Sequence, residues 1–91
     1  MSDGAVTAEY LRNVTFDKPP LGKRGYNEKA VADFVALCAR RLDGRGHLTA
    51  DDVRSVRFNK PSFGKRGFDE NQIDALLAEI ATAIDNLDAG S

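Results

Sequence analysis

Two short segments of the chain carry the same mixture of basic and apolar side chains. Residues 18–25 and 60–67 each hold a lysine, a proline, one large apolar residue and a Lys-Arg pair between two glycines. A loop stiffened by proline and glycine can present the apolar side chain to the acyl boundary of a membrane while the cations meet anionic headgroups. The candidate binding residues are Lys18, Leu21, Lys23, Arg24, Lys60, Phe63, Lys65 and Arg66.

The energies suit a weak anchor that is used twice. Burying Leu21 or Phe63 contributes about 1.5–3 kcal/mol, and each cation near an anionic leaflet adds about 1 kcal/mol. One loop therefore binds weakly, whereas two loops on one rigid body gain through effective concentration. The alternative is a solvated turn whose tip folds back on the core. Binding to nucleic acid is a further alternative, because Lys-Arg beside Phe or Tyr can hold phosphates and stack bases, although the net charge of −1 weighs against it.

Other chemistry-bearing residues are sparse. The chain has one cysteine, Cys38, and one histidine, His47, so it holds no intramolecular disulfide and no complete zinc ligand set of its own Cys and His residues. We interpret Cys38 as a small buried residue and His47 as a solvated linker residue. The Lys-Arg loops lack the flanking residues of a phosphate-binding loop. We therefore expect no enzyme activity, no cofactor and no metal.

The two loops belong to a longer internal repeat with an offset of 42 residues. Residues 7–43 and 49–85 are identical at about 15 of 37 positions, without a gap. This repeat divides a single predicted domain, residues 1–91, into two units at 6–43 and 48–88. The repeat also predicts that the two halves form the same secondary-structure elements in the same order.

Each repeat predicts the same order of elements. A threonine suited to a helix N-cap opens a short helix, and an extended arm ending in Lys-Pro follows. After the glycine-flanked tip, which suits a tight reversal, a second cap opens a longer helix. The long helices are predicted at about 28–43 and 70–88, and Gln72 falls where a capping box would use it. The four predicted caps are Thr7, Asn27, Thr49 and Asp69.

Apolar residues recur on the long helices every three or four positions, which predicts two faces that pack together. Phe34, Leu37 and Leu76 widen this stripe beyond that of a two-stranded coil, so we predict an all-α, pseudo-twofold bundle of two helix-loop-helix repeats. The spacing leaves open whether the long helices run parallel or antiparallel. The predicted seam consists of Val31, Val35, Cys38, Leu42, Ile73, Leu77, Ile80, Ile84 and Leu87.

Composition places the chain among folded domains. Of its 91 residues, 42% are apolar and 30% are charged, and thirteen basic side chains nearly balance fourteen acidic ones. No apolar run is long enough to span a membrane, and residues 1–5 lack the features of a signal peptide. One cysteine suits a reducing compartment. These observations predict a cytoplasmic protein.

The motif Phe-x-Lys-Pro-Pro-Leu-Gly-Lys-Arg-Gly-Tyr-Asn-Glu over residues 16–28, followed by a helix with an apolar seam, resembles the N-terminal domain of the DivIVA family, especially its actinobacterial members. The opening Thr-Ala at residues 7–8 resembles the start of the short helix of that domain. The resemblance covers nearly the whole chain, twice, and leaves out residues 1–5 and 44–47.

This resemblance implies a non-enzymatic protein of bacterial cell division or polar growth, peripheral at most at the inner face of the cell membrane. It also implies a parallel helical dimer with crossed loops, whose apolar and basic tip residues touch lipid. These lipid-contacting roles would fall on Leu21, Lys23 and Arg24 in the first loop. In the second loop they would fall on Phe63, Lys65 and Arg66. Two repeats in one chain would form the paired arrangement internally.

We therefore predict a small DivIVA-like accessory protein that binds a membrane surface, or a division or polar-growth protein, through its Lys-Arg loops. The alternative is a protein-interaction module that never touches lipid and pairs through the Ile73–Leu87 seam with a larger DivIVA-like scaffold. Self-association into a homo-oligomer also stays open.

Overall fold

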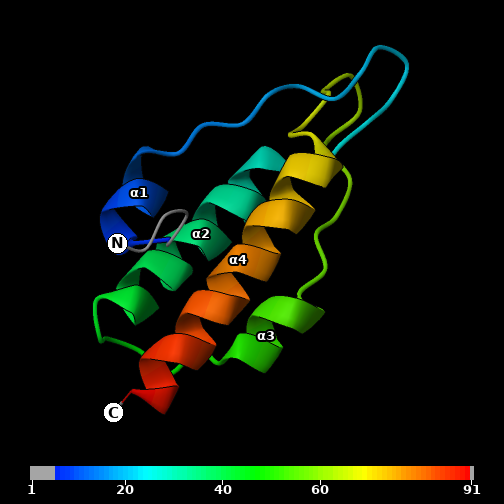
Figure 1. Ribbon diagram of the computed structural model, residues 1–91. Coiled ribbons are helices and arrows are strands. Elements are labelled where there is room, and N and C mark those ends of the chain that lie inside the picture. The colour runs from blue at the N-terminus through cyan, green and yellow to red at the C-terminus, as the bar shows by residue number, and fades with distance from the viewer. Residues whose placement is uncertain (1–5, 91) are drawn as a thin grey trace.

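The computed structural model describes residues 6–90, so the expectation about the first five residues lies outside it. In this range the chain forms four helices, and the predicted all-α fold is confirmed (Figure 1). A short helix, an extended arm with a loop, and a long helix occur in that order twice. The helices are α1 (Ala8–Asn13), α2 (Glu28–Leu42), α3 (Ala50–Ser55) and α4 (Glu70–Ala89).

Side-chain caps define where the helices begin. The Thr7 hydroxyl accepts a hydrogen bond from the Tyr10 backbone N–H at 3.1 Å. Thr49 and Asp52 form a reciprocal capping box on α3. Asn27 and Asp69 accept backbone N–H groups in the first turns of α2 and α4. All four predicted N-cap residues therefore cap their helices as the sequence indicates.

Gln72 has a different role from the one its position suggests. Its amide accepts the backbone N–H of Asp17 and donates to the Asp17 carboxylate, both at 2.8 Å. Both groups belong to Asp17 in the first arm. The Gln72 side chain therefore bonds to a residue distant in the sequence, and not to the N-cap of its own helix. Gln72 thereby fastens the first arm to the start of α4.

The long helices run parallel, side by side (Figure 1). The backbones of Tyr26 and Phe68, just before α2 and α4, pair with each other, so both helices start at the same end of the molecule. Near their other ends, Arg41 forms an ion pair with Asp88. Each short helix packs on the long helix of its own half, α1 on α2 and α3 on α4.

The core lies along the facing sides of the long helices. Of the predicted seam, Leu42 and Leu77 are only partly buried, and Leu87 lies outside the core with 43% of its surface exposed. Leu37 is 50% exposed and does not widen the buried stripe, whereas Leu76 is buried. The buried seam residues are Val31, Val35, Cys38, Ile73, Ile80 and Ile84.

The two arms cross, and each repeat supplies backbone hydrogen-bond partners to the other. Tyr26 and Phe68 exchange backbone hydrogen bonds of 2.9 and 3.0 Å. The backbone N–H of Asn27 donates to Asn59 O, and that of Asp69 donates to Asp17 O, each at 2.9 Å. Each long helix therefore begins against the arm of the opposite repeat.

Aromatic side chains pack across the same crossing. Phe16 of the first arm lies against Phe68, with ring centroids 5.1 Å apart. Phe58 of the second arm lies against Tyr26 at 5.3 Å. These pairs are related by the pseudo-twofold axis, and their burial stabilises the crossing beyond its hydrogen bonds.

We expect Gly25→Ala to destabilise the fold strongly, because an added Cβ would lie 1.7 Å from the Phe68 carbonyl oxygen. The expected loss is about 2–4 kcal/mol of unfolding free energy, typical of a disrupted backbone contact. Gly22→Ala is the matched control, since a Cβ there meets nothing within 4 Å and costs only the strain of its φ of 81°. That strain is about 1–2 kcal/mol. Urea unfolding measures both, and equal losses would contradict the close-approach explanation.

Candidate functional site: the paired loop tips

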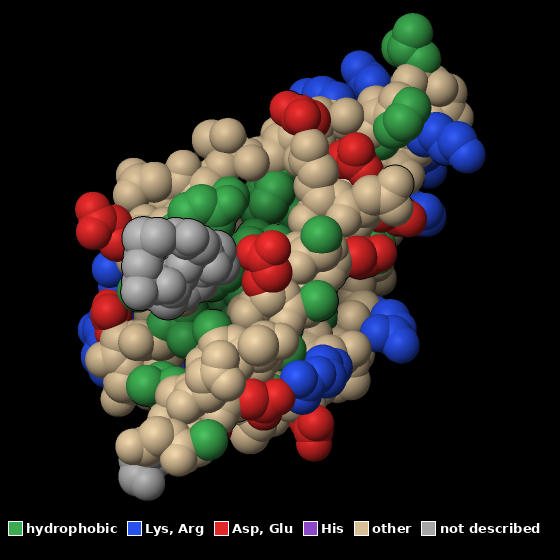
Figure 2. All heavy atoms as spheres, viewed as in Figure 1, with side chains coloured by type: hydrophobic (Ala, Val, Ile, Leu, Met, Phe, Trp, Pro, Cys, Tyr) green, Lys and Arg blue, Asp and Glu red, His purple; other side chains and the backbone are tan. Residues whose placement is uncertain are grey.

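The two loop tips project at one end of the elongated molecule, which measures 45 × 26 × 19 Å (Figure 1). Leu21 is 89% exposed and Phe63 is 101% exposed, so neither side chain folds back on the core. Figure 2 shows apolar and basic side chains gathered at this end. The arrangement is that of two apolar groups held in solvent beside cations.

A tight turn explains why the apolar side chains point outward. The backbone N–H of Lys23 donates to Pro20 O at 3.0 Å, and that of Lys65 donates to Ser62 O at 2.9 Å. The third residue of each turn is a glycine with positive φ, as a type II turn requires. Leu21 and Phe63 occupy the second position, at the apex. The reversal therefore precedes the Lys-Arg pair, whereas the sequence predicted it between the flanking glycines.

The arginines of the Lys-Arg pairs tie the two loops together. Arg24 donates to the carbonyl oxygen of Pro61, and Arg66 donates to that of Pro19. Both prolines are buried, so each guanidinium closes the base of the opposite loop. These two predicted site residues thus have a structural role in addition to any role in binding.

The four lysines fall into two kinds. Lys18 forms an ion pair with Glu28 at 2.8 Å, and Lys60 forms one with Glu70 at 2.9 Å. Within residues 6–90, Lys23 and Lys65 have neither an ion pair nor a side-chain hydrogen bond. The structure therefore leaves these two lysines, next to the exposed tips, as the cations most available to an anionic surface.

Sequence reasoning missed the glutamates as partners of the loop lysines. The signal was present, because a glutamate follows the first loop lysine by ten residues in both halves. Exposed ion pairs of this kind contribute about 0–1 kcal/mol each. Their main effect here is to hold the base of each loop beside the helix that follows it.

The predicted second seam is largely occupied by the chain itself. Ile73, Ile80 and Ile84 are at most 1% exposed because they pack in the core. On that line Leu77 is partly exposed, and Leu87, at the far end of α4, is 43% exposed. Pairing with another protein through the whole seam would require the core to open.

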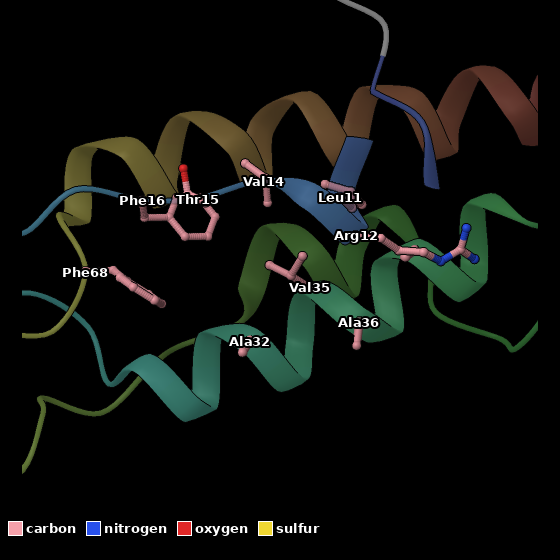
Figure 3. Close-up of a pocket in the computed structure, with 10 residues that line it drawn as sticks. Leu11, Arg12, Val14, Thr15, Phe16, Ala32, Val35, Ala36 and Phe68 are labelled. Carbon is pink, nitrogen blue, oxygen red and sulfur yellow. The ribbon is translucent and has the colours of Figure 1, made fainter. Parts of the chain in front are cut away.

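A separate apolar groove lies between the first arm and α2, away from the tips (Figure 3). Its volume is about 510 Å³, and Val14, Phe16, Ala32 and Val35 are among the residues that line it. The pseudo-equivalent groove in the second half, about 450 Å³, has Asp74 where the first has Ala32. The two halves therefore differ in the polarity of these grooves.

The second groove contains a hydroxyl–carboxylate contact. The Tyr26 hydroxyl donates to Asp74 at 2.8 Å. Burial, this hydrogen bond and the Asp74 charge raise the pKa of Tyr26 to about 12. The corresponding residue of the other half is Phe68, which has no hydroxyl.

Cys38 is fully buried, and burial raises the pKa of its thiol to about 12. A buried neutral thiol is a poor nucleophile and a poor metal ligand. The interpretation of Cys38 as a small buried residue therefore agrees with its position at the interface of the long helices.

The fold and the site define a class of small helical protein in which two halves cross to present a pair of apolar, basic loop tips. Over 37 residues the chain is 49% identical to "Cell wall synthesis protein Wag31" of Mycobacterium tuberculosis (strain H37Rv), and it is equally similar to proteins of that name in Mycobacterium leprae and Mycolicibacterium smegmatis. The match covers 41% of this chain and 14% of each relative, so the chain spans only a small part of the length of the curated relatives it matches.

No protein-family model matches the chain, and no solved structure matches it. Among residues 6–90, no helix is both long and apolar enough to cross a bilayer. The comparisons therefore show a likeness over 37 residues to proteins named for cell wall synthesis.

We expect Tyr26→Phe to lower the unfolding free energy by about 0.5–1.5 kcal/mol near neutral pH, because it removes the bond to Asp74. The folded pKa of about 12 lies above the ordinary value of 10, so the hydroxyl stabilises fully below pH 10. This advantage of the unmodified protein then decreases as pH rises from 10 towards 12. Urea unfolding of both proteins across that range measures it. Tyr10→Phe, at a side chain 51% exposed, is the control and should change little.

We expect Cys38 to resist thiol reagents in the folded protein. Its pKa of about 12 leaves almost no thiolate at about pH 8, and its side chain has no contact with solvent. Reaction with a disulfide reagent should be slow in buffer and complete once guanidinium unfolds the chain. Rapid labelling of the native protein would show that the α2–α4 interface opens readily.

Proposed function

We propose that this protein is an accessory factor of bacterial cell wall growth or division that binds an anionic membrane surface through its two loop tips. The observation that carries the proposal is the exposure of Leu21 and Phe63, at 89% and 101%, beside Lys23 and Lys65. The resemblance to the DivIVA N-terminal domain and the match to a cell wall synthesis protein support the cellular setting.

The crossing supports simultaneous use of both tips. The reciprocal bonds of Arg24 and Arg66 hold the bases of the loops in one body. After one tip has entered the interface, the other meets it at a high effective concentration. Two apolar groups and two lysines contribute about 5–8 kcal/mol together, which reaches into the range of about 4–15 kcal/mol that association costs, whereas one loop contributes only about 2.5–4 kcal/mol.

The same loops are the favoured surface if the ligand is a division protein. An acidic partner with an apolar pocket would use the same tip residues. A nucleic acid would depend on the lysines and on salt, with little dependence on the apolar tips. The three ligands can therefore be separated by which substitutions weaken binding.

We expect the protein to co-sediment with vesicles of phosphatidylcholine mixed with phosphatidylglycerol, and not with phosphatidylcholine alone. Replacing both tips, Leu21→Ser with Phe63→Ser, should weaken binding at least about tenfold, because two buried apolar groups are lost. The fold should be unaffected, since both side chains lie outside the core.

Leu37→Ser with Leu87→Ser is the matched control for this pair. It also replaces two exposed apolar residues, but on the body of the molecule, at α2 and α4. This variant should bind as the unmodified protein does. Absence of vesicle binding by the unmodified protein at low salt would reject the membrane proposal, and equal weakening by the two pairs would show that the tips are not the anchor.

A further inference from the structure

The side of α2 that points away from the core is basic. Lys29, Ala36 and Arg40 follow one another there at helical spacing, and all three are exposed. We call this line of residues the α2 face. Lys29 forms an ion pair with Asp33 at 2.9 Å, one turn along the same side. Within residues 6–90, Arg40 has neither an ion pair nor a side-chain hydrogen bond, so its charge is unmatched.

The corresponding side of α4 is smooth and acidic. The repeat offset of 42 residues places Asn71, Ala78 and Thr82 there, and all three are exposed. We call this line the α4 face. The exposed carboxylates of Glu79 and Asp85 border it, and α4 contains no lysine or arginine. The two halves have therefore diverged on their outward sides into a basic face and an acidic one.

We propose that the α2 face of one copy of this chain binds the α4 face of a second copy. The two faces lie on opposite sides of the α2–α4 pair, so a sideways shift of one copy brings them together (Figure 1). The long helices run parallel, so residues 42 positions apart lie at the same height. Ala36 would then lie against Ala78 of the second copy, and Arg40 would lie between that copy's Glu79 and Asp85.

Charge favours this pairing over the two symmetric ones. Contact between two α2 faces would bring Arg40 of one copy towards Arg40 of the other. Contact between two α4 faces would bring the carboxylates that border them together. Like charges across an interface are unfavourable, whereas the mixed contact joins opposite charges. Identical halves could offer only like charges to each other, so the divergence of the repeats is what makes the contact complementary.

A contact between two different faces does not close on itself and continues as a row of copies. A sideways shift leaves the paired tips of every copy at the same end, so a row would present all of its tips to one surface. The small residues at its centre make the contact weak for two free copies. Copies confined to one surface would meet at a higher effective concentration. The inference goes beyond the proposed function, because the contact does not require a membrane.

The first test joins the two faces by a disulfide in solution. The full chain carrying Ala36→Cys with Ala78→Cys is oxidised at about 1 mM, a concentration that populates weak contacts. These positions lie on opposite sides of the α2–α4 pair, so one chain cannot join its own two cysteines. We expect a ladder of linked dimers, trimers and longer products on a non-reducing gel. A mixture of the two single-cysteine variants is the control, and its products should stop at dimers.

The second test reverses the charges within this double-cysteine chain. Arg40→Glu should slow ladder formation at least about fivefold, because it places a carboxylate beside Glu79 and Asp85 of the second copy. Adding Glu79→Arg should restore most of the rate. Neither side chain has a bond within the described residues, so both variants should fold, and urea unfolding checks this.

Two results would overturn the proposed contact. One is the absence of a ladder from the double-cysteine chain, and the other is a ladder whose rate Arg40→Glu does not change. Vesicle binding is measured separately on the unmodified chain. Failure of that binding would reject the membrane function alone, whereas failure of the ladder in solution would reject the contact alone.

Discussion

The structure depends on the exchange of backbone hydrogen bonds between Tyr26 and Phe68. A chain of this size buries too little surface to stabilise two separate helix pairs. The exchange brings the starts of α2 and α4 together and aligns them in parallel. It also requires a glycine at position 25, where the Phe68 carbonyl leaves no room for a side chain. The packing of the isoleucines on α4 and the position of both tips follow from this single crossing.

The crossing also explains why the basic residues of the loops have different bonding partners. The two arginines bind carbonyl oxygens of the opposite loop, and the first lysine of each loop pairs with a glutamate of its own repeat. The cations that bind within the loops are therefore distinct from Lys23 and Lys65, which have no such partner within residues 6–90. A loop built this way keeps its shape without contact between its apex and the core, so a large apolar side chain can remain exposed.

Much of the fold could be predicted from local patterns. The caps at Thr7 and Thr49, the long helices and most of the buried seam follow from residue type and spacing, because these depend on neighbours within one or two turns. The direction of the helices did not follow from the apolar pattern, since parallel and antiparallel packing place the same apolar faces together, and only the family resemblance implied the parallel arrangement that the structure has. Bonds between distant segments were also missed, such as the one from Gln72 to Asp17, which replaced the expected local capping bond.

The candidate site shows the same limit. Its residue types were evident from the repeated loops, whereas the separation of Arg24 and Arg66 from Lys23 and Lys65 depends on carbonyl groups far away in the sequence. The difference between the two grooves likewise follows from single substitutions, such as Ala32 against Asp74. The repeat pairs these two positions in the sequence, but only the structure shows that both residues line grooves.

Because both halves belong to one chain, their pairing does not depend on protein concentration. Two separate chains with this crossing would come apart on dilution, because their association would depend on protein concentration. Here the short segment 43–49 between α2 and α3 keeps the halves together at any concentration. The paired tips therefore remain available in a cell that holds only a few copies of the protein.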